Sequence, residues 1–175
     1  MGELMRPRSR VRSVANWVNL STPAGLLVAH LAADRPRRSR DGLWIVHGYR
    51  PTLPSARAFT LGSVILLRDP LPGPGLDPVG RVPVRLLAHE ERHATQYAWC
   101  GGLLMPVGYA VAAGWSWLAT GDPASSNMFE RRAGLADGGY LERPTRAVWG
   151  SWTGRGGSPG EGPGALSRVS GATGS

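Results

Sequence analysis

The chain has 175 residues, a single cysteine and a formal net charge of +8, and it contains no lysine, so arginine supplies the positive charge. The single cysteine excludes an intramolecular disulfide framework and favours a reducing compartment, so the expected location is cytoplasmic. The length suits one domain with a buried core.

Composition divides the chain into three parts. We expect residues 1–14 to form a disordered basic arm, residues 15–145 to form a single domain, and residues 146–175 to form a disordered tail rich in glycine and serine. Residues 1–40 carry +6 of the net charge, which could attract anionic lipid or nucleic acid. A solvated arm is the simpler interpretation, so we expect no specific binding of nucleic acid.

The first half of the domain is expected to contain one helix and two strands. Ser21-Thr22-Pro23 is a typical helix start, with a hydroxyl cap and a proline in the first turn, and the helix should run to about Ala33. The composition of residues 43–46 and 59–67 predicts two strands. Prolines and glycines crowd residues 69–82, which predicts a loop.

The second half is expected to be helical. Pro83 begins a helix that should run to about Cys100, where Gly101-Gly102 stops it. A second apolar segment spans residues 103–119, and a third helix is expected over residues 125–136. Together these elements predict an α+β domain, in which a helical core packs beside a small antiparallel β-sheet.

The sequence His89-Glu90-Glu91-Arg92-His93 lies inside the helix that Pro83 begins, and it matches the H-E-x-x-H zinc motif. Positions i and i+4 share one face of a helix, so both imidazoles can bind one metal ion. Glu90 would then lie where a general base is needed. Residue frequencies predict about 0.003 such motifs in a shuffled chain of this composition, so chance rarely produces it.

Two histidines make an incomplete zinc site, because a catalytic site normally has a third protein ligand and one open position. Glu130 follows His93 by 37 residues and lies on the expected third helix. It is the preferred third ligand, and the weaker alternatives are Asp122, Asp137 and Glu142.

The pattern H-E-x-x-H-x-x-Q, then a glycine-containing apolar helix, then N-x-x-E-x-x-A, resembles the gluzincin arrangement of zinc metallopeptidases. It is most similar to small bacterial metallopeptidase-like domains that share this layout. The resemblance covers about residues 59–140. It implies that His89, His93 and Glu130 bind one Zn²⁺ ion and that Glu90 is the general base.

The sequence departs from thermolysin-like gluzincins, which place an acidic residue four positions after the glutamate ligand to orient a histidine. Here that position is Gly134, so the residue that orients the histidine is unassigned. Asn127 and Asp137 are the candidates. Gln96 and Tyr97 are expected to be packing residues. The residues available to stabilise a transition state are Tyr97, Tyr109 and Tyr140.

These patterns predict metal-assisted hydrolysis of a peptide or protein substrate at a peptide or amide carbonyl group. The strand at residues 59–67 could form the sheet edge along which an extended peptide aligns. The alternative from another class is a zinc-binding interaction domain without turnover. A further alternative is a membrane-associated protein with a basic arm, in which the histidines are incidental.

Residues 94–121 contain no charged side chain, and residues 103–119 are long and apolar enough to consider as a membrane contact or span. A span would carry the chain about 30 Å across the bilayer and leave His93 and Glu130 on opposite sides. The two could not then share a metal ion. We therefore expect a buried or interfacial helical hairpin here, in which the apolar segment turns back toward the motif.

Overall fold

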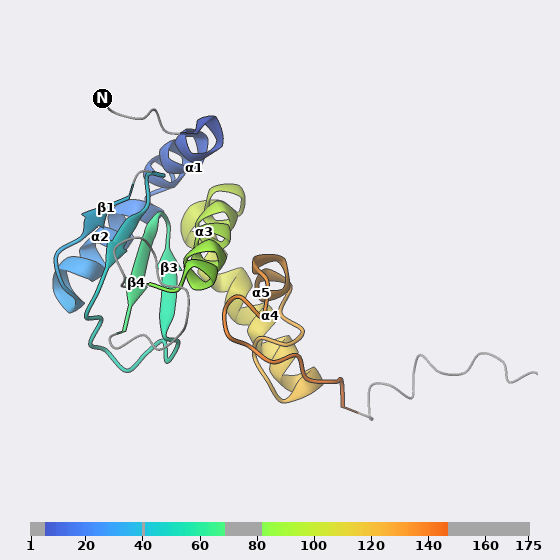
Figure 1. Ribbon diagram of the computed structural model, residues 1–175. Coiled ribbons are helices and arrows are strands. Elements are labelled where there is room, and N and C mark those ends of the chain that lie inside the picture. The colour runs from blue at the N-terminus through green and yellow to red at the C-terminus, as the bar shows by residue number, and fades with distance from the viewer. Residues whose placement is uncertain (1–5, 40, 69–81, 147–175) are drawn as a thin grey trace, which may run out of the picture.

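The computed structural model describes residues 6–39, 41–68 and 82–146, and these form an α+β fold in which helices surround a small sheet (Figure 1). The expected tail, except for Arg146, and nearly all of the expected loop at residues 69–82 lie outside the described residues. The elements in chain order are α1 (Pro7–Val18), α2 (Ser21–Ala32), β1 (Arg37–Arg38), β2 (Trp44–Val46), β3 (Ala58–Leu61), β4 (Val64–Leu67), α3 (Val84–Trp99), the 3₁₀ helix η1 (Gly102–Leu104), α4 (Met105–Thr120) and α5 (Met128–Ala133).

The sheet in the described part of the chain is mixed rather than purely antiparallel, with four strands in the order β1-β2-β4-β3. β2 and β4 run parallel, whereas β1 pairs with β2 and β3 pairs with β4 in antiparallel fashion. The departure from the expected antiparallel sheet arises because β3 takes the outer edge and β4 returns beside β2. Two strands of the same direction thereby become neighbours.

The apolar run at residues 59–67 forms a β-hairpin instead of the single strand that its composition predicts. Gly62 and Ser63 join β3 to β4, and Gly62 has a φ of +64°, which suits a two-residue hairpin turn. A Cβ atom on Gly62 would lie 2.4 Å from the backbone of Ser21, so the start of α2 packs directly on this turn. The strand predicted at residues 43–46 is confirmed as β2, and the helix predicted from Ser21 is confirmed as α2.

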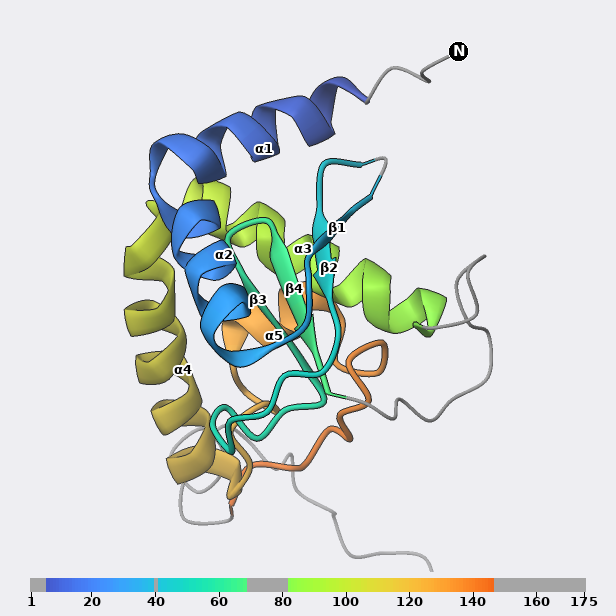
Figure 2. The same cartoon turned by 90° about the vertical axis from the view of Figure 1, so that its left-hand side faces the viewer.

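The sheet lies between two helices, with α2 in front of it and α3 behind it in Figure 2. Successive side chains of a strand point to opposite faces. In β4, Val64 and Leu66 therefore pack in the cluster on the α2 side, while Ile65 and Leu67 pack in the cluster on the α3 side. All four are fully buried, so these clusters fix α3 against the sheet.

Helix α1 corrects the expectation of a disordered arm over residues 1–14, because the chain is helical from Pro7 onward. The buried side of this helix is polar and consists of Ser9, Arg12, Ser13 and Asn16. Arg12 Nη1 lies 2.6 Å from Glu91 Oε1 on α3. Asn16 Nδ2 donates to the carbonyl oxygen of Ala94 at 2.8 Å. Because polar contacts hold this helix, its sequence has no apolar periodicity. Composition alone therefore predicts disorder for this segment.

The apolar segment after the motif forms η1 and α4 and turns back as expected, with a bend at Gly101 and Gly102 and an end at Gly121. Much of it is exposed, so of the two expected alternatives, a buried or an interfacial hairpin, the buried one is wrong. Gly102–Thr120 is long and apolar enough to cross a membrane by length and composition alone, and 22% of it is buried. Helix α5 is shorter than the helix predicted over residues 125–136, because it begins after Asn127 and ends before Gly134.

Candidate metal centre

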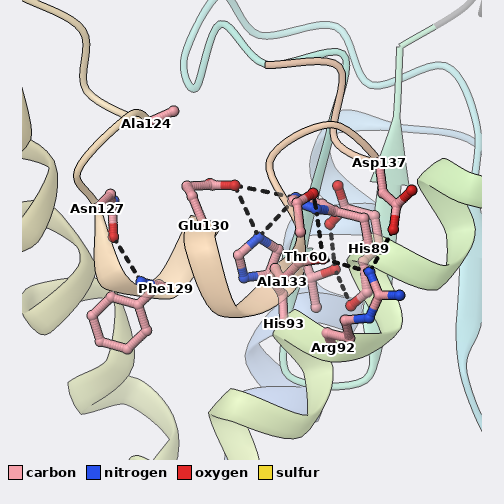
Figure 3. Close-up of polar contacts among 12 residues, drawn as sticks. Thr60, His89, Arg92, His93, Ala124, Asn127, Phe129, Glu130, Ala133 and Asp137 are labelled. Carbon is pink, nitrogen blue, oxygen red and sulfur yellow. Dashed lines mark hydrogen bonds and ion pairs between the residues drawn. The ribbon is translucent and has the colours of Figure 1, made fainter. Parts of the chain in front are cut away.

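Three side chains from two helices converge where α5 lies against α3 (Figure 3). His89 and His93 are one turn apart on α3, and Glu130 extends toward them from α5. The two Nε2 atoms are 3.0 Å apart, and Glu130 Oε2 lies 3.2 Å from Nε2 of His89 and 3.6 Å from Nε2 of His93. All three side chains are buried. The residues that the sequence indicates as ligands thus form one group that could hold a metal ion.

Glu130 reaches the histidines because the chain reverses after α4. Asp122 holds the turn after Gly121 by accepting two backbone hydrogen bonds at its Oδ1, at 3.0 and 2.8 Å. Asn127 Oδ1 then accepts from the N–H group of Phe129 at 3.0 Å and caps α5. The cap fixes where α5 starts, and Glu130 lies in its first turn.

The orientation of His93 is set by Gln96, which the sequence suggested as a packing residue. Gln96 Nε2 donates to the carbonyl oxygen of Phe129 at 2.9 Å, so Gln96 Oε1 faces Nδ1 of His93, at 2.8 Å. An amide oxygen accepts but cannot donate, so the proton of His93 lies on Nδ1. Its Nε2 atom therefore carries a lone pair that points toward Glu130.

The orientation of His89 is set by backbone carbonyl groups. Its Nδ1 atom lies 3.2 Å from the carbonyl oxygen of Ala133 and 3.0 Å from that of Gly134. Arg92 Nη1 donates to the same carbonyl oxygen of Ala133 at 2.6 Å and holds it in place. Because these oxygens only accept, His89 also carries its proton on Nδ1 and presents a lone pair at Nε2.

The arrangement directs three electron pairs at one another in a buried space. Two imidazoles protonated on Nδ1 cannot hydrogen-bond to each other through Nε2, and among the described residues Glu130 Oε2 has no hydrogen-bond donor. A cation between the three atoms removes the repulsion between these lone pairs. A tetrahedral site with bonds of about 2.0–2.1 Å has ligand atoms about 3.3 Å apart. The observed separations of 3.0, 3.2 and 3.6 Å lie around that value, so the residues fit a metal ion.

The electrostatics of the group also favour a positive charge. Protonating a histidine at Nε2 relieves the same repulsion: burial alone would raise the pKa of Glu130, but hydrogen bonds donated by protonated His89 and His93 lower that pKa to about 2, so the carboxylate stays ionised. Burial would lower the pKa of His93, but Glu130 and Glu90 raise it above the ordinary value. The two shifts are coupled, because a protonated His93 and an ionised Glu130 stabilise each other in a buried space.

Glu90 lies on the same helix and points toward the sheet. Thr60 Oγ1 donates to Glu90 Oε2 at 2.7 Å, so the edge strand β3 fixes the orientation of this carboxylate. Burial raises the pKa of Glu90, while His93, Thr60 and His89 partly offset that rise. Thr60 can reach Glu90 because alternate residues of β3 face α3, a relation that the sequence motif alone does not reveal.

A pocket of about 310 Å³ opens above these side chains, with His89, Glu90, His93 and Glu130 in its lining. β3 forms one wall, and the start of α4 forms another. A second cavity of about 420 Å³ shares His89, Glu90 and several wall residues with the first, so the two adjoin. The candidate ligands therefore lie at a site that a small molecule or a peptide side chain can reach.

The residues suggested for orienting a histidine have other roles. Asn127 caps α5, and Asp137 Oδ2 accepts from Arg92 Nη1 at 2.8 Å. Gly134, four residues after Glu130, instead contributes its backbone carbonyl oxygen, which lies 3.0 Å from Nδ1 of His89. Sequence reasoning missed this because a carbonyl group has no signature in the sequence, whereas the spacing H-x-x-Q could have indicated Gln96.

The three candidate tyrosines all line the pocket. Tyr109 donates its hydroxyl to Glu130 Oε1 at 2.5 Å, so it positions a candidate ligand. The ring of Tyr140 lies 6.1 Å from that of His89. Gly138 makes this approach possible, since a Cβ atom there would lie 2.7 Å from Cε1 of His89. The pKa values of Tyr97, Tyr109 and Tyr140 are raised, chiefly by burial, so all three keep their hydroxyl proton at neutral pH.

Comparison of the chain with models of protein families, with curated proteins and with solved structures finds no match in any of the three.

Proposed function

We propose that this protein is a zinc-dependent hydrolase of peptide or amide bonds, of the gluzincin-like kind that its motifs imply. The observation that carries the proposal is the convergence of His89 Nε2, His93 Nε2 and Glu130 Oε2 within 3.6 Å of one another at a pocket. Two imidazoles and one carboxylate are the donor set of many catalytic zinc sites. Imidazole nitrogen also favours zinc over magnesium or calcium, which prefer oxygen ligands.

The chain supplies a proton acceptor and a binding surface beside this donor set. A zinc ion held there would polarise a carbonyl group and lower the pKa of a water molecule. Glu90 would take the proton of that water, a role supported by its carboxylate, which lines the pocket and accepts from Thr60 at 2.7 Å. Tyr109 keeps Glu130 oriented toward the histidines.

The walls of the pocket favour an extended peptide as substrate. β3 is an edge strand in the described part of the chain, so one side of its backbone has no neighbouring strand. Phe59, Thr60 and Leu61 of this strand line the pocket beside Glu90. A peptide that pairs with β3 would carry its carbonyl groups past the candidate metal centre.

Replacing Glu90 by glutamine tests the proposed chemistry. We expect Glu90→Gln to retain bound zinc and to lose cleavage of a peptide library by at least about 100-fold, since general-base catalysis supplies about 10²–10⁴ in rate. Zinc content is measured by elemental analysis and cleavage by mass spectrometry. Glu91→Gln is the matched control, because Glu91 lies one residue along and contacts Arg12 on α1.

Two results would contradict the peptidase proposal. Equal cleavage by wild type and Glu90→Gln would show that Glu90 is not the base. If the wild-type protein held zinc but cleaved nothing in the library, the competing function, a zinc-binding interaction domain without turnover, would replace the hydrolase.

A further inference from the structure

Helix α4 exposes an apolar face, and at the carboxyl end of the helix the Arg146 guanidinium lies 6.0 Å from the centre of the Trp117 ring. Helices on the surface of a water-soluble domain normally turn charged residues outward, but neither η1 nor α4 contains any. The outward side chains are each 52 to 70% exposed, and they include Leu104, Val107, Val111, Trp115, Trp117 and Leu118. The inward side of the same helix contributes Met105 and Tyr109 to the pocket.

Helix α1 likewise turns apolar side chains toward solvent. Its buried side is polar, whereas Val14 and Val18 on its outer side are 63 and 77% exposed. Arg10, Val14 and Val18 are spaced four apart and share one stripe of the helix. The start of α1 exposes three basic side chains, which are Arg6, Arg8 and Arg10. The outer surface of α1 is therefore basic where the helix begins and apolar where it ends.

The two apolar surfaces meet at one junction. Asn19, which follows α1, donates to the carbonyl oxygen of Tyr97 at 3.2 Å. The same asparagine packs against Gly102, where a Cβ atom would lie 2.4 Å from its side chain. Figure 2 shows the end of α1 above the start of α4 on the same side of the molecule. Trp99, at the end of α3 and 81% exposed, extends this surface.

We propose that this surface docks the protein peripherally on a membrane that contains anionic phospholipids. The docking face comprises the outward side chains of α4 and the carboxyl ends of α1 and α3. Four of the seven tryptophans of the chain are exposed on these elements, namely Trp17, Trp99, Trp115 and Trp117. Tryptophan favours the boundary between lipid headgroups and acyl chains.

Basic side chains at the amino end of α1, one helix length from the docking face, indicate which partner this face fits. Neither α1 nor α4 contains an acidic residue, and the arginines at the start of α1 match the phosphate groups of anionic lipids. The long arginine stems can lie along the apolar surface while the guanidinium groups reach the headgroups. A second copy of the chain would bring the same arginines and no compensating acidic residue from these helices.

The geometry favours docking over a membrane span. α3 precedes α4 and α5 follows it, yet His89 of α3 and Glu130 of α5 lie 3.2 Å apart. A helix that crossed the bilayer would separate them by about 30 Å. A helix that lies in the plane of the interface leaves them together and places the pocket beside the lipid surface. Docking by this surface requires neither bound zinc nor hydrolysis.

Vesicle flotation of the purified full chain tests the inference. Vesicles of phosphatidylcholine mixed with phosphatidylglycerol are compared with vesicles of phosphatidylcholine alone. The double variant Val107→Asp, Val111→Asp should reduce the fraction that floats with the mixed vesicles at least about tenfold, since charges oppose burial in the interface. Val84→Asp is the matched control, because Val84 is 53% exposed and begins α3 at the end opposite Trp99.

A second double variant tests the role of the arginines. Arg8→Gln, Arg10→Gln should weaken binding to the mixed vesicles severalfold and remove the preference for them over phosphatidylcholine alone. Circular dichroism checks that the variants are folded. Quenching of wild-type tryptophan fluorescence by brominated lipids adds a readout that requires no variant and should be clear with the mixed vesicles.

Three results would overturn the proposal. The first is a wild-type protein that does not float with the mixed vesicles and shows no quenching. The second is unchanged flotation of the Val107→Asp, Val111→Asp variant. The third is a wild-type dimer that does not bind vesicles and that these substitutions dissociate, which would make the docking face an interface between copies of this chain.

Discussion

The position of two protons decides the chemistry of the candidate metal centre. Gln96 and the carbonyl oxygens of Ala133 and Gly134 hold these protons on the Nδ1 atoms of the two histidines. The Nε2 lone pairs are thereby aimed at the same point as Glu130 Oε2 before any metal binds. Such preorganisation raises metal affinity, because the rings lose little freedom on binding.

Gln96→Met tests this orienting role. The variant keeps the length of the side chain but removes the oxygen that accepts from His93 Nδ1, so zinc affinity should fall about 10–100-fold. Competition with a chromogenic chelator measures the affinity. Gln96→Glu is the informative comparison, because it restores an oxygen that accepts from His93 but, like methionine, cannot donate to the carbonyl oxygen of Phe129, so it should bind zinc more tightly than Gln96→Met. If Gln96→Met bound zinc as tightly as wild type, the orienting role would be wrong.

At the level of helices and strands, the sequence predicted elements whose residues follow an apolar pattern and missed those held by polar contacts. α2 and α3 were predicted within one or two residues, since Pro23 lies in the first turn of α2 and Pro83 directly precedes α3. The hydroxyl cap expected at the start of α2 does not form, because Ser21 and Thr22 lie inside the helix. α1 was missed because its buried side is polar, and its stability depends on partners such as Glu91 that are distant in sequence. The β3–β4 hairpin was missed because Gly62 lies inside an otherwise continuous apolar run.

The turn between α4 and α5 controls where Glu130 lies, and Asp122 stabilises that turn. Burial raises the pKa of Asp122, but hydrogen bonds from Ser125 and Ala124 lower it by more, which leaves it below the ordinary value. The stabilisation is therefore fully present above the pKa of the unfolded chain, about 3.9, and is lost as the pH falls through the lower pKa of the folded protein.

Asp122→Ala should lower the free energy of unfolding at neutral pH by about 1–2 kcal/mol, because two backbone N–H groups and one hydroxyl lose their acceptor. The difference from wild type should shrink in acid. Urea unfolding at several pH values measures both effects, with Asp122→Asn as a variant that keeps an acceptor but does not titrate. A difference that grew as the pH fell would contradict the assignment.

For the whole molecule, the sequence could indicate the ligands but not how they meet. The H-E-x-x-H spacing places His89 and His93 on one helical face wherever the helix lies. The position of Glu130 beside them depends on α4 returning the chain, and that of Thr60 depends on α3 packing against the edge strand. Those relations arise from long-range packing, which local sequence patterns do not encode. Which face of α4 is exposed likewise depends on long-range packing, so local sequence patterns do not predict it.

The binding of zinc to the full chain, after chelator treatment and followed by isothermal titration calorimetry, tests the central claim most directly. We predict one zinc ion per chain and at least about tenfold weaker binding by Glu130→Ala, because one of three protein ligands is lost. Glu142→Ala is the matched control, since Glu142 pairs with Arg131 away from the pocket and should bind as wild type does. Absence of zinc binding by the wild-type chain, or unchanged affinity in Glu130→Ala, would contradict the account.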